Sequence, residues 1–184
     1  MLCYNITVRP RKVRWAMTPP PTRPRPCTDP HGGGRHVPYE RIALATAICR
    51  ERGVQMTELR RGILELLWAR REPASAYQLM EALKRRDSRP VGPPTVYRAL
   101  AFLMAQGLVS KIETLNAYLP CAHPERDHDC MFFICQGCRA SVEFVDPRIT
   151  TLLAEHAAVL GFVATSRTVE VEGRCARCAE AGAA

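Results

Sequence analysis

Apolar residues recur three or four positions apart after about residue 39, which is the spacing of one face of an α-helix. Residues 39–53 read YERIALATAICRERG and end in glycine, so we expect a leading helix there. A second helix should begin after Thr57, whose hydroxyl suits an N-cap, and stop before Pro73. Its apolar stripe consists of Leu59, Ile63, Leu66 and Leu67.

Two more helices and a hairpin are predicted downstream. Ser75 is placed to cap a short helix, AYQLMEALKRR. Residues 93–107, PPTVYRALAFLMAQG, start with prolines, as many helices do, and end at Gly107, a suitable C-cap. The apolar face of this segment consists of Val96, Leu100, Leu103 and Met104. Extended runs at 108–113 and 117–120 then predict a hairpin, and helix, helix, helix, hairpin is the order of a winged helix-turn-helix.

The second half of the chain mixes strand and helix patterns. MFFIC (131–135) and SVEFV (141–145) are predicted strands, and TVEVEG (168–173) is a third. Residues 147–161 predict a helix between them. Its apolar side carries Ile149, Leu152, Leu153, His156 and Leu160. We interpret His156 as a core or interface residue rather than a metal ligand, and Glu170 and Glu172 as solvent-facing.

The formal net charge of +8 is distributed unevenly. Residues 1–38 carry a net +6, residues 39–118 a net +5 and residues 119–184 a net −3. A basic middle and an acidic end suit a nucleic-acid-binding part joined to a part with another role. Eight prolines and a GGG run within residues 1–38 predict a disordered extension.

The chain has nine cysteines, an odd number, so they cannot all pair in disulfides. Residues 1–30 contain no long apolar run of the kind that a signal peptide needs. We therefore expect a reducing compartment, the cytoplasm, in which the thiols are free or bind metal. No apolar stretch approaches the roughly 20 residues that span a bilayer, so no membrane segment is expected.

Two CxxC units, Cys135 with Cys138 and Cys175 with Cys178, are separated by 36 residues. Two such turns place four thiolates about 2.3 Å from one Zn²⁺ in a closed tetrahedron, which is a structural site. A redox-active pair needs one CxxC at the start of a helix, whereas Gly137 leads into a predicted strand. The spacing therefore favours structural zinc.

A second candidate site lies in the loop CAHPERDHDC. It contains Cys121, His123, His128 and Cys130, and Glu143 follows on a predicted strand. Any one of these residues alone is as consistent with a buried thiol or a solvated imidazole as with a ligand. One thiolate, two imidazoles and one carboxylate together suit Zn²⁺ better than a hard cation. The role of Cys130 stays open.

A zinc deaminase is the alternative for this region, because His123 and Glu125 precede a CxxC unit as in the H-x-E, P-C-x-x-C pattern. Ile134 stands where that pattern has proline, and only nine residues separate Glu125 from Cys135. No nucleophile and base pair is evident either, so we do not expect an enzyme.

The motifs together resemble the ferric uptake regulator family, and within it the zinc uptake regulators, over about residues 40–178. PPTVYRALAFLMAQGLVSKIE resembles the recognition helix and wing, NAYLPC the entry to the sensing site, and FICQGC, VEF and GRCARC the dimerisation domain. The resemblance implies an α+β fold with a winged-helix DNA-binding domain over 39–119. A metal-binding α/β dimerisation domain with a four-cysteine structural zinc would follow over 120–184.

The resemblance implies a homodimeric, metal-responsive repressor that binds inverted-repeat DNA and about two zinc ions per subunit, with no other small-molecule substrate. The sensing ligands of the zinc branch map onto Cys121, His128 and Glu143. A fourth ligand, a histidine, maps onto Ser110, which is a poor zinc ligand. Either His123 or water would then complete the site. An iron-, manganese- or peroxide-responsive repressor of the same family is the alternative, and a zinc-dependent enzyme is a more distant one.

In a winged helix the recognition helix lies in the major groove. We expect Thr95, Tyr97 and Arg98 to face DNA, with Arg98 reading a guanine edge. Tyr77 on the preceding helix resembles another base-contacting position, and its alternative is a packing tyrosine. The candidate phosphate contacts are Arg60, Arg61, Lys84, Arg85, Arg86 and Lys111.

Overall fold

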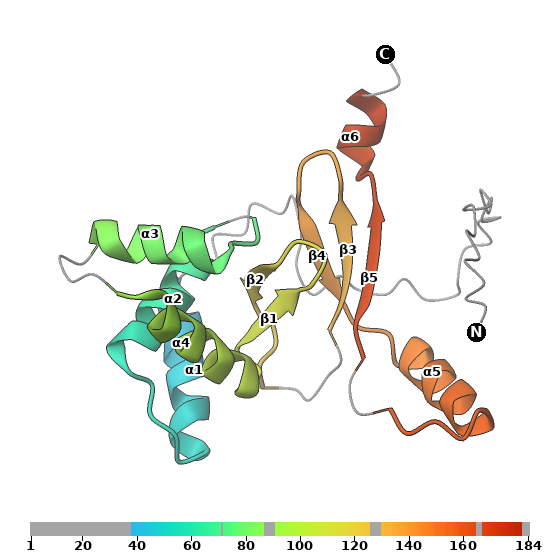
Figure 1. The fold of residues 1–184 in the computed structure, drawn as a ribbon, viewed down its shortest axis with the longest axis horizontal. Coiled ribbons are helices and arrows are strands. Elements are labelled where there is room, and N and C mark those ends of the chain that lie inside the picture. The colour runs from blue at the N-terminus through green and yellow to red at the C-terminus, as the bar shows by residue number, and fades with distance from the viewer. Residues whose placement is uncertain (1–37, 71, 87–90, 126–129, 165–166, 182–184) are drawn as a thin grey trace, which may run out of the picture.

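The computed structural model describes residues 38–70, 72–86, 91–125, 130–164 and 167–181. The predicted disordered extension, apart from residue 38, and His128 lie outside this described part. The first half contains α1 (Pro38–Glu51), α2 (Glu58–Trp68), α3 (Ala76–Arg86), α4 (Pro93–Ala105), β1 (Val109–Ile112) and β2 (Ala117–Pro120). The second half contains β3 (Met131–Cys135), β4 (Ser141–Phe144), α5 (Pro147–Val159), β5 (Val169–Gly173) and α6 (Ala176–Ala181). Figure 1 shows the four helices on one side of the β1–β2 hairpin and the second sheet on the other.

The helix ends carry the caps that the sequence predicts. Thr57 Oγ1 accepts a hydrogen bond from Arg60 N at the start of α2. Before α3, Ser75 and Gln78 each accept from the other's backbone N–H, at 3.2 and 2.9 Å. Beyond α4, Gly107 adopts a positive φ of 63°, the left-handed conformation that glycine tolerates at a C-cap. These local signals confirm the predicted order of helices.

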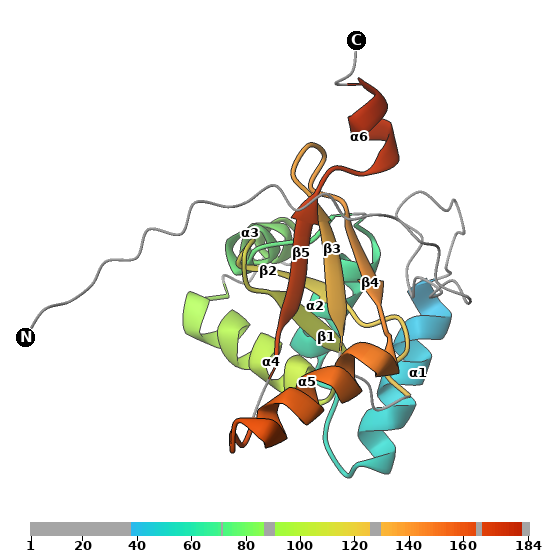
Figure 2. The same ribbon diagram turned by 90° about the vertical axis from the view of Figure 1, so that its right-hand side faces the viewer.

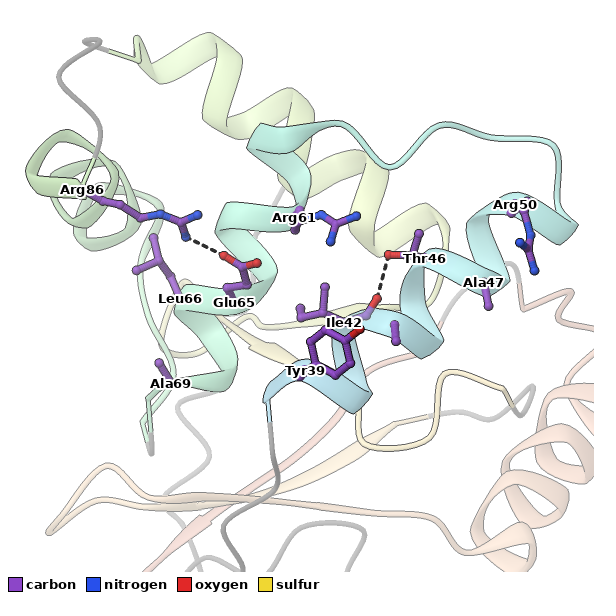
Figure 3. Close-up of a pocket in the computed structure, with 11 residues that line it drawn as sticks. Tyr39, Ile42, Thr46, Ala47, Arg50, Arg61, Glu65, Leu66, Ala69 and Arg86 are labelled. Carbon is purple, nitrogen blue, oxygen red and sulfur yellow. Dashed lines mark hydrogen bonds and ion pairs between the residues drawn. The ribbon is translucent and has the colours of Figure 1, made fainter.

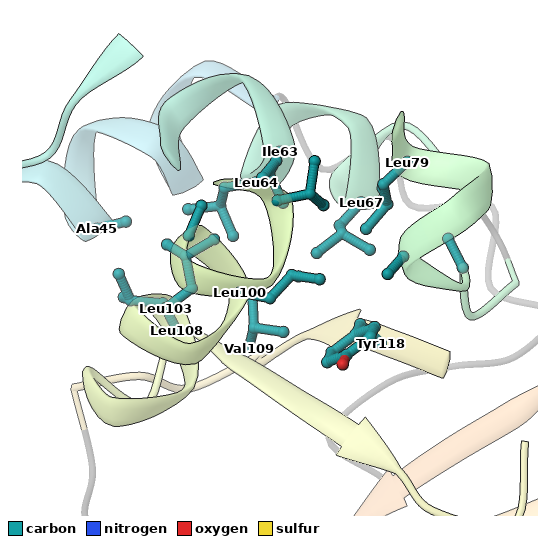
Figure 4. Packing of buried hydrophobic residues seen from close by; sticks show 14 of the residues in the cluster. Ala45, Ile63, Leu64, Leu67, Leu79, Leu100, Leu103, Leu108, Val109 and Tyr118 are labelled. Atoms are coloured by element: carbon teal, nitrogen blue, oxygen red, sulfur yellow. The ribbon is translucent and has the colours of Figure 1, made fainter. Parts of the chain in front are cut away.

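The helices enclose the larger of two apolar cores, drawn in part in Figure 4. Its fully buried members include Ile63, Leu64, Leu79, Leu100 and Leu103. The hairpin closes this core by contributing Val109 and Tyr118. Residue Ala74, just before α3, pairs with Tyr118 through two backbone hydrogen bonds of 2.9 Å. Hairpin and helices therefore form one packed unit.

The two faces of the hairpin belong to different cores. In the antiparallel β1–β2 pair, Ser110 lies opposite Leu119 and Lys111 lies opposite Tyr118. Since side chains alternate along a strand, the face with Tyr118 packs on the helices and the face with Leu119 points away from them. Ile112 and Leu119 pack with Phe132 and Ile134 of β3 in the second core.

The second sheet has the order β4-β3-β5, with β3 antiparallel to β4 and parallel to β5. The parallel pair needs a crossover, and α5 supplies it (Figure 2). The sequence analysis missed α6, which has only six residues. No residue of α5 is buried, and Leu152, Leu153 and Leu160 on its predicted apolar side are 53%, 43% and 80% exposed. Among the described helices, none has the length and apolar content that a bilayer crossing requires.

Candidate metal centres

The four cysteines of the two CxxC units converge at the tip of the second sheet. Cys135 ends β3, Cys138 follows in the turn, Cys175 precedes α6 and Cys178 lies in its first turn. Their four sulfur atoms all lie within 4.8 Å of one another, and the sulfurs of Cys138 and Cys175 are 3.8 Å apart. Four thiols around one point fit a closed tetrahedral Zn²⁺ site.

The turn between Cys135 and Cys138 is shaped for close approach of the second unit. Cys135 N donates to Ala140 O, and Arg139 N donates to Cys135 O, each at 2.9 Å. A Cβ atom added at Gly137 would lie 3.0 Å from the sulfur of Cys178 and 3.1 Å from its Cβ. A side chain at residue 137 would therefore have to displace Cys178 by a few tenths of an ångström, because α6 packs directly on the turn.

The environment of this cluster favours a thiolate at one position. Backbone N–H groups, that of Cys175 foremost at 3.3 Å, donate to the sulfur of Cys135 and lower its pKa to about 6. Hydrogen bonds shared with the sulfurs of Cys175, Cys138 and Cys135 raise the pKa of Cys178 to about 12. Backbone N–H donors of this kind orient and stabilise metal-bound thiolates, so the donor set fits zinc.

A second cluster lies between the two cores and consists of Cys121, Cys130 and Glu143. One ligand atom from each residue lies within 4.8 Å of the others. Glu143 on β4 is fully buried and Cys121 is 3% exposed. The Glu143 Oε1 atom is 3.8 Å from the sulfur of Cys121 and 3.2 Å from that of Cys130. A carboxylate buried beside two thiols is costly unless a cation shares the site.

The members of this cluster come from the end of the hairpin and from the second sheet. Cys121 follows β2 directly, and its N–H donates to Leu108 O at 3.0 Å, which fixes it to the winged-helix unit. Glu143 belongs to the second sheet. A metal ion at this point would therefore have ligands from both packed units.

The third member of this cluster, Cys130, is a residue that the sequence analysis left without a role. Ser110 Oγ donates to its sulfur at 3.4 Å. The hydrogen bond with Cys121, burial and the charge of Glu143 raise the pKa of Cys130, so metal binding would release its proton. Alternation along β3 was the available signal, because Cys130 lies two residues before Phe132, whose register partner is Glu143.

Of the two histidines of the predicted site, only His123 lies within the described residues. His123 is half-exposed, its Nδ1 lies 3.3 Å from Glu125 Oε1, and it is not part of the three-residue cluster. His128 falls outside the described residues. Ser110, which occupies the place of the missing family histidine, does face the cluster through Cys130.

Glu170 forms a further link between the two units that the sequence analysis did not predict. Glu170 on β5 was expected to face solvent, but it is half-buried and caps the turn of the hairpin. Its carboxylate accepts hydrogen bonds from Glu113 N at 2.6 Å, Thr114 N at 3.0 Å and Thr114 Oγ1 at 2.6 Å. Burial acts to raise the pKa of Glu170, but the hydrogen bonds from Thr114 and Glu113 outweigh it and lower the pKa.

The DNA-facing candidates lie on the outer side of the winged-helix unit. Tyr77 on α3 is 67% exposed and Tyr97 on α4 is 53% exposed, and Thr95 and Arg98 are also exposed. Val96, Leu100 and Leu103 on the opposite face of α4 are buried. Tyr77 is therefore not a packing residue within this chain.

Several basic side chains that were expected to contact phosphates are engaged within the protein. The guanidinium of Arg60 lies 3.4 Å from the ring centroid of Phe102. Arg86 forms a 2.6 Å ion pair with Glu65. Lys111 pairs with Glu113, whereas Lys84 and Arg85 are exposed.

A groove of about 730 Å³ lies between α1 and α2. Figure 3 shows Tyr39, Ile42 and Thr46 from α1 facing Arg61 and Leu66 from α2. None of its lining residues belongs to either thiol cluster.

Comparisons with known proteins show which chains this one is similar to. A model of the "Ferric uptake regulator family" matches residues 51–172. The "Zinc uptake regulation protein" of Escherichia coli (strain K12) is 36% identical over 142 residues, which cover 77% of this chain and 82% of that protein. A solved structure described as "Zinc Uptake Regulator Complexed With Zinc AND DNA" is 34% identical with a TM-score of 0.77, over 82% of this chain and 100% of that chain. A second, "Crystal structure of holo XcZur", is 39% identical with a TM-score of 0.70, over 77% and 98%.

Proposed function

The chain belongs to the ferric uptake regulator family, and on that basis we propose that it is a zinc-responsive repressor of genes for zinc uptake and homeostasis. It binds inverted-repeat operator DNA as a zinc-loaded homodimer and acts as a transcriptional regulator, not as an enzyme. The observation that carries the zinc response is the cluster of thiol and buried carboxylate ligands between the two packed units. Relatives named for zinc uptake regulation support the same choice of metal.

The four-cysteine cluster holds the structural ion of this proposal. Cys135, Cys138, Cys175 and Cys178 would supply all four ligands of a tetrahedral ion, which would leave no open position for a substrate. Zn²⁺ bound there supplies a cross-link between the end of β3 and α6. Gly137 keeps the two turns close enough for that cross-link.

The proposal has about two zinc ions per subunit, and the second of them is the regulatory ion. Cys121 and Glu143 bind it from opposite sides of the interface between the two units. His128 is a further proposed ligand, and His123 is a candidate for the last position. Capture of one ion by Cys121 and Glu143 selects a single orientation of the winged-helix unit relative to the second sheet.

The recognition helix of the proposal is α4. Its buried face holds it on the helical core, while Thr95, Tyr97 and Arg98 are exposed toward a major groove. Tyr77 on α3 adds a contact beside it. In a homodimer the two copies of α4 would enter successive major grooves about 34–36 Å apart. Lys84 and Arg85 remain available for phosphates.

The homodimer surface of the proposal is α5 with the adjoining strand. Exposed apolar side chains gather there, namely Leu152, Leu153, Val159, Leu160, Phe162, Val163 and Val171. A large exposed apolar patch on a soluble chain marks an interaction site. Self-association that buries this patch would bring two winged-helix units onto one operator.

The zinc response follows from linkage between the two binding events. If zinc raises operator affinity by a given factor, operator DNA must raise zinc affinity at the regulatory site by the same factor. The protein would work in the cytoplasm, where reduced thiols persist.

The direct test is a fluorescence titration of palindromic promoter DNA against the homodimer at buffered free zinc. Operator affinity should rise with zinc, and Cys121→Ser should abolish that rise. Parallel titrations with Fe²⁺ and Mn²⁺ test the iron and manganese alternatives. Equal affinity of the chelated and zinc-loaded protein for the same fragment would refute the proposal.

A further inference from the structure

We propose that Cys130 is a ligand of the regulatory zinc ion, so that this chain senses zinc with two thiolates and a buried carboxylate. The inference deepens the proposed function and rests on it. It also answers how the site works with a serine at position 110, where an imidazole would otherwise be expected.

The ligand atoms are already close to the geometry that the metal needs. With Zn–S bonds near 2.3 Å and Zn–O bonds of about 2.0–2.2 Å, the ligand atoms of tetrahedral Zn²⁺ lie roughly 3.5–3.8 Å apart. The sulfurs of Cys130 and Cys121 lie 3.2 and 3.8 Å from Glu143 Oε1. Both distances are therefore within a few tenths of an ångström of the spacing that tetrahedral Zn²⁺ needs, and the two sulfurs themselves lie within 4.8 Å of each other.

The fold holds Cys130 at this point from two directions. It immediately precedes β3, and alternation places it on the same face as Phe132 and Ile134, toward the hairpin. Ser110 on β1 lies opposite Leu119 on the facing side and donates to the Cys130 sulfur at 3.4 Å. A ligand at residue 130 thus occupies the space into which a longer side chain at residue 110 would reach.

The competing role for Cys130 is that of a hydrogen-bond donor to Glu143. A serine at the same position would keep an O–H donor but would be a poor zinc ligand. Cys130→Ser therefore separates the two roles without removing the polar contact. His123, the other candidate for the position, is half-exposed and directed to Glu125.

A second thiolate changes the chemistry of the site in two measurable ways. Two thiolates and one carboxylate on Zn²⁺ leave a net charge of −1 on this part of the site, whereas one thiolate and one carboxylate leave it neutral. Sulfur ligands also favour zinc over manganese and iron, whose sites rely on oxygen and nitrogen. The site is therefore expected to discriminate against Mn²⁺ more strongly than one with a single thiolate.

The experiment uses the full-length homodimer with zinc in its four-cysteine site and Co²⁺ titrated into the second site. Thiolate-to-cobalt charge-transfer absorbance scales with the number of bound thiolates, so Cys130→Ser should show half the wild-type intensity. Its zinc affinity, measured by chelator competition, should fall by more than the roughly 10- to 100-fold that loss of an outer-shell partner costs. Cys49 is a buried thiol in α1 outside both clusters, so Cys49→Ala should match wild type in cobalt absorbance and zinc affinity.

A double variant tests whether a ligand at residue 110 can replace the one at residue 130. Ser110→His combined with Cys130→Ser should restore much of the zinc affinity while keeping the half-intensity cobalt spectrum. Mass spectrometry after alkylation adds a measurement on the unaltered protein, because zinc should protect Cys130 and Cys121 from the reagent together.

Wild-type intensity and affinity in Cys130→Ser, or alkylation of Cys130 in zinc-loaded protein, would overturn the inference. Zinc-dependent operator binding by wild type would still uphold the proposed function in that case. The reverse outcome, halved cobalt intensity with zinc-independent operator binding, would support the ligand role and refute the proposed function instead.

Discussion

Glu170→Gln should weaken operator binding although the residue touches neither zinc ligand cluster nor the recognition helix. The carboxylate receives three hydrogen bonds from Glu113 and Thr114, at the turn of the hairpin that connects to α4. It thereby holds the winged-helix unit against β5. Without these hydrogen bonds, the unit should leave the orientation that fits an operator.

The expected magnitude follows from the kind of hydrogen bond that the substitution removes. A hydrogen bond to a charged group contributes about 1.5–3 kcal/mol, and partial exposure of Glu170 reduces this because water competes. Glutamine keeps one acceptor oxygen but has neither the charge nor the second acceptor. A total of about 1–2 kcal/mol remains, which corresponds to a roughly 5- to 30-fold decrease in operator affinity.

The sign of the pH dependence is also fixed. The pKa of Glu170 is lowered in the folded state, so its contribution is complete above the ordinary glutamate pKa of 4.5. It is lost as the pH falls through the lowered value. The affinity difference between wild type and Glu170→Gln should therefore be constant near neutral pH.

The assay is fluorescence anisotropy of labelled operator at saturating free zinc. Glu172→Gln is the matched control, because Glu172 lies on the same strand and its carboxylate is 3.4 Å from Gln136 instead of the hairpin. Glu172→Gln should bind within about twofold of wild type, since the hydrogen bond of Glu172 is exposed and joins it to Gln136 and not to the hairpin. If Glu170→Gln binds as tightly as Glu172→Gln, the proposed role of Glu170 in orienting the winged helix is wrong.

Three further predictions concern the structural site, the DNA-facing helix and the dimer surface. Gly137→Ala should lower the thermal midpoint and speed zinc loss to a chelator, at a cost of roughly 1–3 kcal/mol, because its Cβ would press on Cys178; Gly173→Ala, where a Cβ meets nothing within 4 Å, should have little effect. Arg98→Ala should cost about 1–3 kcal/mol on the operator and relax sequence preference in a binding-site selection; unchanged preference would exclude base reading by Arg98. Leu153→Asp, at a 43% exposed position of α5, should shift the sedimentation profile from dimer to monomer without unfolding the chain; an intact dimer would place the interface elsewhere.

The winged-helix order could be predicted because its signals are local. Thr57, Ser75 and Gly107 act within one turn of their own helices, and the structure uses all three at helix ends. The four-cysteine cluster could also be predicted from the sequence, since CxxC spacing alone brings two sulfurs together. These features require no knowledge of how distant segments pack.

The features that sequence reasoning missed depend on strand pairing. Glu170 meets the hairpin because β5 lies parallel to β3 with Phe132 opposite Glu170, and no local pattern specifies that register. Cys130 meets Glu143 through the antiparallel register of β3 and β4. The short helix α6 brings Cys178 against Gly137, a contact between distant segments that no local pattern specifies. Alternation indicates which residues share a face, but it does not identify the opposite strand.

The β1–β2 hairpin, whose two faces serve two different cores, constrains how this chain can change. A substitution at one position disturbs one core, but an insertion or deletion of a single residue would exchange the faces beyond it. Tyr118 would then turn away from the helices while its neighbour Leu119 turned into them. Related chains should therefore accept substitutions in this segment more readily than changes in its length.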